Sequence, residues 1–164
     1  MSSLLPSLVI LGGVAAAALF LARERSSPVD LVEERVAAAT ALGLAIAAQG
    51  AHFAEEWATG FHIRFPALFG LPPMPLSFFV TFNLAWLVIW IVSVPFVRSA
   101  RRPAFFAAWF LAIAAMMNGA AHPALAIASE GYFPGLITSP AIGLAGLWLW
   151  VRLRRATTES RNAA

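Results

Sequence analysis

The chain has 164 residues, of which 60% are apolar and only 12% are charged, and its mean hydropathy is +0.79. Soluble domains carry about 25% charged residues, so this composition excludes an ordinary water-soluble fold. Cysteine is absent, which excludes disulfides, cysteine nucleophiles and thiolate ligands and leaves nitrogen and oxygen as the ligand atoms for any metal. The net charge of +3 rests on arginine, and we interpret it as a topology signal at the membrane edge rather than as a nucleic-acid footprint.

Apolar stretches long enough to cross the hydrocarbon, which takes about 20 helical residues, follow one another along most of the chain. There are five, at about 4–22, 30–59, 76–97, 103–129 and 133–153. We therefore predict an all-α fold, a polytopic transmembrane bundle with five spans. Residues 1–155 would form this single domain, and residues 156–164 would form a short polar cytoplasmic tail.

Residues 60–75, between the second and third predicted spans, are apolar but rich in proline and too short to cross the membrane. This pattern predicts an interfacial or re-entrant segment on the outer face. The segment could cover a site as a lid, or it could be a connector that rests among the lipid headgroups. The sequence leaves both possibilities open.

The arginines predict the orientation of the chain, because arginine and lysine are enriched in cytoplasmic segments. With five spans, ten of the eleven arginines fall on one side of the membrane, and only Arg64 falls on the other. This bias predicts an outside N-terminus and a cytoplasmic C-terminus for an integral membrane protein.

Ionisable side chains within the predicted spans form a small group, and such residues indicate function because charge in hydrocarbon is costly. His52, Glu55 and Glu56 share one face of the second helix at i, i+3 and i+4, and Asn118 and His122 stand at i, i+4 on the fourth. Counting about 1.5 Å per residue from the cytoplasmic arginines places the two faces at nearly equal heights. We therefore predict that they meet in the outer half of the bilayer.

Three motifs together resemble the HxxEE family of small bacterial and archaeal integral membrane proteins. They are His52-Phe53-Ala54-Glu55-Glu56, Asn118-Gly119-Ala120-Ala121-His122 and Tyr132-Phe133-Pro134-Gly135. The resemblance implies a bacterial or archaeal cytoplasmic membrane and adds Tyr132 to the candidate site residues. It implies no particular activity, because the family supplies no function to transfer.

Two imidazoles and two carboxylates on facing helices suggest a nitrogen and oxygen site for Zn, Fe or Mn. The first hypothesis is therefore a membrane-embedded metal-dependent enzyme, a hydrolase or oxidoreductase, with a lipidic or amphiphilic substrate. His52, Glu56 and His122 would be metal ligands. Glu55, Asn118 and Tyr132 would be catalytic residues, with Glu55 either a second carboxylate ligand or a general base.

Two further hypotheses use the same residues without a metal. A buried glutamate next to a histidine could act as an acid and base pair for isomerisation or cyclisation of an isoprenoid or sterol-like substrate. Alternatively, the cluster could be a structural polar network in an accessory or transport protein, since polar contacts between membrane helices are common. The sequence predicts membrane lipid and no nucleic acid among the partners, and it leaves the metal and the oligomeric state undetermined.

Overall fold

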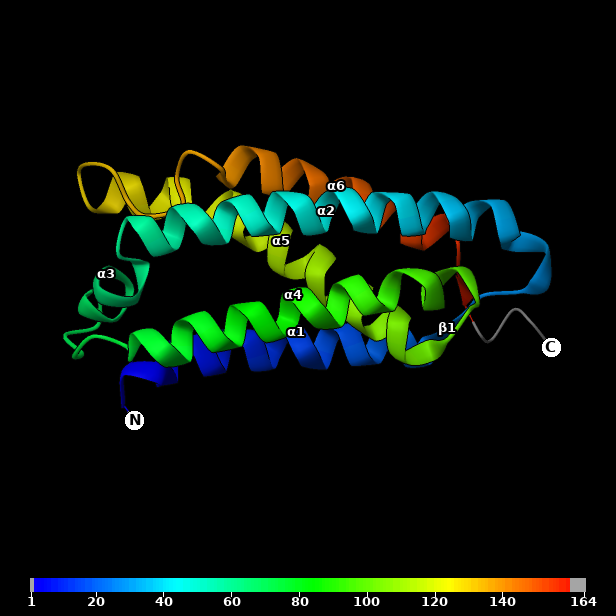
Figure 1. Ribbon diagram of the computed structural model, residues 1–164, viewed down its shortest axis with the longest axis horizontal. Coiled ribbons are helices and arrows are strands. Elements are labelled where there is room, and N and C mark those ends of the chain that lie inside the picture. Colours follow the sequence, from blue (N-terminus) through cyan, green and yellow to red (C-terminus); the bar gives the residue numbers. More distant parts are fainter. Residues whose placement is uncertain (1, 160–164) are drawn as a thin grey trace.

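The structure, a computed structural model, describes residues 2–159 and is helical apart from one small sheet (Figure 1). Among these residues, four helical segments are long and apolar enough to cross a membrane. They contain α1 (Leu5–Glu24, after the 3-10 turn η1, Ser2–Leu4), α2 (Val32–Ala58, after the 3-10 turn η2, Val29–Leu31), α4 (Leu76–Arg98) and α5 (Arg102–Ala128). The prediction of an all-α integral membrane protein is confirmed at this level.

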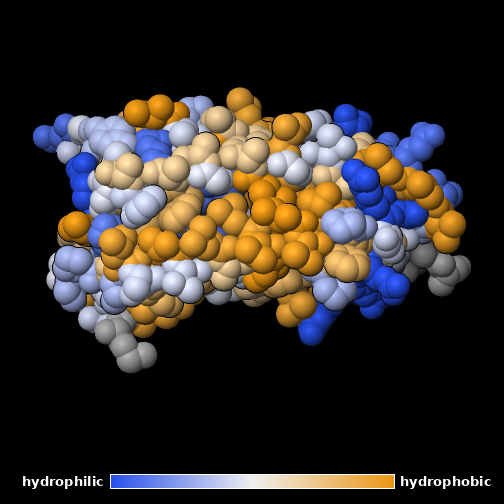
Figure 2. All heavy atoms as spheres, viewed as in Figure 1, coloured by the Kyte–Doolittle hydropathy of each residue, from blue (hydrophilic) through white to orange (hydrophobic). Residues whose placement is uncertain are grey.

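The surface of the bundle carries an apolar band in its middle, with hydrophilic residues concentrated towards the end of the molecule near the C-terminus (Figure 2). Large apolar side chains point outward along α1 and α4, for example Val9, Phe20, Val88 and Ile91. A contiguous apolar surface of this size is unfavourable in water and is the normal surface of a protein in lipid.

The fifth predicted span, 133–153, begins later than the apolar pattern indicates. Helix α6 is Ser139–Arg155, which is 17 residues; residue 133 has no regular structure, and residues 134–138 form turns instead. Gly135 has a φ of +90°, in the left-handed region that glycine tolerates and that breaks a helix. Five full spans are therefore not confirmed.

Residues 60–75 form a seven-residue helix, α3 (Phe61–Ala67), followed by turns and extended chain. Figure 1 shows α3 at the end of the bundle where α2 ends and α4 begins. The extended part is held to α3 by the backbone N–H of Met74, which donates to the carbonyl oxygen of His62 at 2.8 Å. A re-entrant path is not confirmed.

Helix α5 is the centre of the bundle, because α1, α4 and α6 all pack against it, while α2 packs against α4 and α6. In Figure 1 it runs obliquely between the pair α2 and α6 and the pair α1 and α4. Its buried face alternates small and large residues: Ala108, Ala112 and Ala115 allow close approach, and the fully buried Trp109 and Leu111 fill the space between helices.

At the arginine-rich end of the bundle, hydrogen bonds connect segments that are far apart in the sequence. The buried Arg35 guanidinium donates to the carbonyl oxygens of Arg98 (3.0 Å) and Pro28 (2.6 Å), joining the start of α2 to the end of α4. Strand β1 (Arg25–Ser26) pairs antiparallel with β2 (Thr158–Glu159). The first part of the predicted tail is thus packed on the domain, and residues 160–164 of that tail lie outside the described residues.

Helices α5 and α6 touch through glycine. A Cβ on Gly119 would lie 2.5 Å from the Cα of Gly143, and a Cβ on Gly146 would lie 2.7 Å from the Cβ of Ala115. Contacts this short leave no room for a methyl group, so the backbones meet directly. This contact fixes α6, and with it the 134–138 turns, against α5.

We predict that Gly119→Ala lowers the stability of the protein by about 1–3 kcal/mol, because the added methyl group must push α6 away from α5. The measurement is thermal unfolding in detergent. Gly13→Ala is the matched control, since nothing lies within 4 Å of a Cβ at that helical position. Its melting temperature should equal or exceed that of the wild type, because alanine favours helix over glycine. Equal melting temperatures for Gly119→Ala and Gly13→Ala would contradict the close contact.

Candidate metal centre

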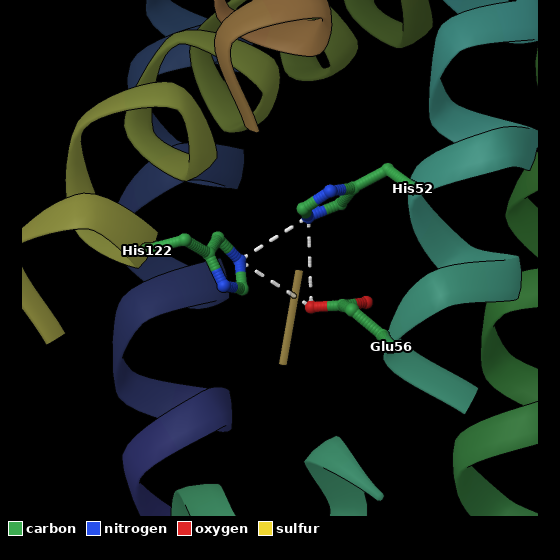
Figure 3. Close-up of side chains that lie close together, drawn as sticks. All are labelled: His52, Glu56 and His122. Carbon is green, nitrogen blue, oxygen red and sulfur yellow. Dashed lines mark hydrogen bonds and ion pairs between the residues drawn. The ribbon is translucent and has the colours of Figure 1, made fainter. Parts of the chain in front are cut away.

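Three side chains from two helices converge in the interior of the bundle (Figure 3). His52 and Glu56 lie one turn apart on α2, and His122 reaches them from α5. The two Nε2 atoms are 3.2 Å apart, and Glu56 Oε1 lies 3.6 Å from that of His52 and 3.4 Å from that of His122. All three residues are buried. The predicted meeting of the second and fourth spans is confirmed by these distances.

The outer nitrogen of each imidazole has a hydrogen-bond partner that determines which nitrogen carries the proton. His122 Nδ1 faces the carbonyl oxygen of Pro134, which can only accept, so Nδ1 is the donor. His52 Nδ1 lies 2.7 Å from Thr138 Oγ1, whose own proton is donated to Glu55 Oε2. The hydroxyl therefore accepts from His52. Both histidines are protonated on Nδ1 and carry a lone pair on Nε2.

These tautomers place three acceptor atoms face to face. The two Nε2 lone pairs and the Glu56 carboxylate oxygen repel one another unless a proton or a metal ion lies between them. The edge of a tetrahedron around Zn²⁺ with ligands at about 2.05 Å is about 3.3 Å. The observed separations of 3.2, 3.4 and 3.6 Å match that edge. Histidines whose second nitrogen donates to a carbonyl or hydroxyl are also typical of metal sites. The residues therefore fit a divalent ion.

Glu55 has a different environment from Glu56, although the two are adjacent. Its carboxylate accepts hydrogen bonds from the Tyr132 hydroxyl (2.7 Å), the backbone N–H groups of Ile137 (2.9 Å) and Thr138 (2.8 Å), and the Thr138 hydroxyl. Four donors thus hold it to the loop after α5. Glu55 is not among the three convergent side chains, so the geometry gives it the task of anchoring the loop that orients the imidazoles.

Tyr132 lies on that loop and supports the same interaction. Partial burial, together with its hydrogen bond to the Glu55 carboxylate, raises the pKa of Tyr132. The phenol is therefore protonated at neutral pH and serves as the donor. The backbone carbonyl of Tyr132 accepts a hydrogen bond from Arg64 on α3 at 2.8 Å, which ties α3 to this loop.

Asn118 lies one turn before His122 on α5 and makes no hydrogen bond to the three convergent side chains. It lines an adjacent apolar cavity with a volume of about 200 Å³, on whose wall Glu56 and His122 also lie. Glu56 and His122 thus border a space in which a substrate could lie, and Asn118 lines the same space.

Besides Thr138, whose hydroxyl oxygen lies 2.7 Å from His52 Nδ1, two contributors to the site were not among the predicted site residues. One is the Pro134 carbonyl, and backbone atoms give no signal in side-chain patterns. The other is Gly135, where a Cβ would lie 2.6 Å from His122 Nδ1 and 2.8 Å from His52 Cε1. The Pro-Gly pair that follows Tyr132 was the available signal, because it indicates a turn rather than a helix.

Comparison with known proteins finds no relative, since no family model, no curated protein and no solved structure matches the chain. The resemblance to the HxxEE family remains a prediction that rests on the three motifs.

We predict that Gly135→Ala disrupts the histidine pair, because the methyl group would overlap both rings and because alanine is strained at a φ of +90°. The melting temperature should fall, and the side-chain ¹⁵N signals of His52 and His122 should shift. Gly131→Ala in the same loop is the control, because its nearest neighbour would be 3.9 Å away. If both variants kept wild-type histidine spectra, Gly135 would not support the rings.

Proposed function

We propose that the protein is a membrane-embedded metal-dependent enzyme that acts on a lipidic or amphiphilic substrate. The observation that carries the proposal is the convergence of two imidazole lone pairs and a carboxylate oxygen, with both Nδ1 protons committed elsewhere. Three convergent lone pairs of this kind form a site for a metal ion when the Glu56 carboxyl group is deprotonated. The adjacent apolar cavity supports a substrate with an apolar body.

The residues divide the work according to their contacts. His52, Glu56 and His122 hold the ion, and a divalent ion there supplies Lewis-acid chemistry. Thr138 and the Pro134 carbonyl fix the two rings. Asn118 hydrogen-bonds the substrate from the cavity wall. Glu55 and Tyr132, which the sequence suggested as catalytic, act as positioning residues because they secure the loop.

The metal-free alternative requires a proton, instead of a metal ion, in the gap between the histidines. The 3.2 Å separation of the Nε2 atoms is short enough for a shared proton, so the same pair could act as an acid and base. The two possibilities differ in metal content, which can be measured directly.

We predict that the detergent-purified protein binds about one divalent ion per chain, Zn, Fe or Mn, and that His122→Ala abolishes this binding, because it removes one of three ligands. Elemental analysis after buffer exchange measures both. His62→Ala is the control, since His62 is the third histidine of the chain and lies outside the cluster. Wild-type protein without metal, after exposure to all three ions, would exclude the metalloenzyme.

The substitution Glu56→Gln tests whether the Glu56 carboxylate is a ligand of the metal ion. Glutamine keeps the size but removes the charge, so metal affinity should fall while the melting temperature holds or rises in the absence of metal. If Glu56 instead served only as a structural partner of His52 and His122, glutamine would leave buried groups uncompensated and cost about 3 kcal/mol or more. A large loss of stability with unchanged metal content would therefore contradict the role of Glu56 as a ligand.

We also propose that α6 is the fifth membrane span and that α3 with the chain up to residue 75 covers the outer end of the site. Support for the span comes from its 17 residues, about 25 Å of helix, and from its packing along α2 and α5. Support for the cover comes from Phe61 and Phe65 of α3, which line the cavity beside His122. A bacterial or archaeal cytoplasmic membrane follows from the HxxEE resemblance.

With α6 as the fifth span, the N-terminus lies outside and the C-terminus is cytoplasmic. We predict that a C-terminal fluorescent-protein fusion is bright and that a C-terminal alkaline phosphatase fusion is inactive, because most arginines then lie in the cytoplasm. Fusions at the N-terminus should give the opposite result. An active C-terminal phosphatase fusion would reverse the topology and place the metal centre in the inner leaflet.

A further inference from the structure

The cavity beside the metal centre lies between α1, α2, α4 and α5, and α3 contributes to its outer end. Most of its lining is apolar, including Leu8, Leu11, Phe65, Phe79, Phe82 and Trp86. Glu56 and His122 are part of the same wall. The side chains of Glu56 and His122 therefore border this space, whereas His52 lies behind them and is not part of the lining.

The cavity is long and narrow. Its lining residues on α5 run from Phe110 to Leu125, and those on α4 run from Phe78 to Trp90, which corresponds to about 20 Å of helix. Its volume is only about 200 Å³. This length is that of one extended long hydrocarbon chain.

The inner end of the cavity is lined by aromatic rings. Trp86 stacks on Phe110 with ring centroids 4.2 Å apart, and Trp90 is fixed by a hydrogen bond of 3.0 Å from its Nε1 to the Ala107 carbonyl oxygen. All three side chains line the cavity. The metal centre and this aromatic floor are therefore at different depths, and a bound chain would extend from one to the other.

Two amide side chains on the cavity wall have unused hydrogen-bonding capacity. Gln49 is buried and Asn118 is half-buried, and neither makes a side-chain hydrogen bond to another residue within 2–159. Gln49 lies two turns from Glu56 on α2, and Asn118 lies one turn from His122 on α5. An unpaired amide in an apolar cavity costs free energy, and an oxygen atom of a ligand would satisfy it.

We propose that this cavity binds a single-chain fatty acid, with its carboxylate at His52, Glu56 and His122 and its hydrocarbon chain directed to Trp86 and Trp90. The inference rests on the proposed function and names the substrate class of that site. Charge supports the carboxylate head, because two neutral imidazoles, one carboxylate and a divalent ion leave one positive charge. The amides of Gln49 and Asn118 donate to the head, and the apolar walls hold the chain.

Tryptophan fluorescence tests the orientation. Stearic acid carrying a terminal bromine should quench the metal-loaded, detergent-solubilised protein saturably, because the bromine reaches Trp86 and Trp90. Stearic acid brominated next to the carboxylate should bind but quench less. The quenchable fraction should fall in Trp86→Phe. A brominated phosphatidylcholine should give no saturable quenching. Quenching that does not saturate, or that is equal for the acid and the phospholipid, would overturn the proposal.

A variant that fills the cavity tests whether the cavity holds the hydrocarbon chain of the fatty acid. Ala114 lies on the wall between Asn118 and Phe110, one turn from each, so Ala114→Phe should weaken binding of stearic acid about tenfold or more and weaken binding of decanoic acid less. The milder Ala114→Leu should give an intermediate effect if the phenylalanine variant does not fold. Ala124→Phe is the control, because Ala124 is exposed on the same helix and does not line this cavity. Equal affinities of Ala114→Leu and Ala124→Phe for stearic acid would overturn the placement of the hydrocarbon chain in this cavity.

Metal content separates this inference from the function on which it rests. Fatty acid binding that disappears on chelation supports the carboxylate at the ion. Normal metal content without saturable quenching overturns the fatty acid site alone and leaves the metalloenzyme standing. Saturable quenching in a protein that binds no metal overturns the metalloenzyme and, with it, the placement of the carboxylate on an ion.

Discussion

The buried Glu56 carboxylate, next to two imidazole lone pairs, is the arrangement on which the rest of the structure depends. Taking a carboxylate out of water costs several kcal/mol, and facing it with two further acceptors adds repulsion. Such a group persists only where the surrounding fold holds it and a proton or a cation balances it. The close contact of α5 with α6 and the ordered loop between them are intelligible as the support that this arrangement requires.

That support runs through the adjacent glutamate. Glu55 binds the loop with four hydrogen bonds, and the loop in turn binds both histidines through Thr138 and the Pro134 carbonyl. The two neighbouring carboxylates therefore have different roles, and their positions on α2 decide that Glu56 meets the histidines while Glu55 holds the loop. Glu56 stands one full turn from His52 and shares its face, whereas Glu55 is rotated by about 100° towards α6 and its preceding loop.

The sequence predicted the helices, their order and the meeting of His52 and Glu56 with His122, because helical spacing and height are properties of residue number alone. It could not predict that the Glu55 carboxylate binds the loop before α6 instead of joining His52, Glu56 and His122. Two adjacent residues on a helix point in directions about 100° apart, and the position of the neighbouring helix decides which of them meets His122. The predicted start of the fifth span, at residue 133, was wrong. Apolar residues at 133 and 136–137 continue the composition of a span, but Pro134 and Gly135 interrupt the helical backbone, so α6 begins at Ser139. Arg35 was read only as a topology signal, yet it is buried and joins α2 to α4, a role that composition does not reveal.

The loop that carries Thr138 and the Pro134 carbonyl has a further consequence for kinetics. Both imidazoles depend on this one short segment, so a local opening of the loop releases both rings at once while the helices stay in place. If the site holds the proposed metal ion, the rate at which this ion exchanges is set by that opening rather than by diffusion through the membrane. Amide hydrogen exchange at Ile137 and Thr138, whose N–H groups are bound to Glu55, would report the same event. Glu55, which never touches the ion, would thereby control its residence time.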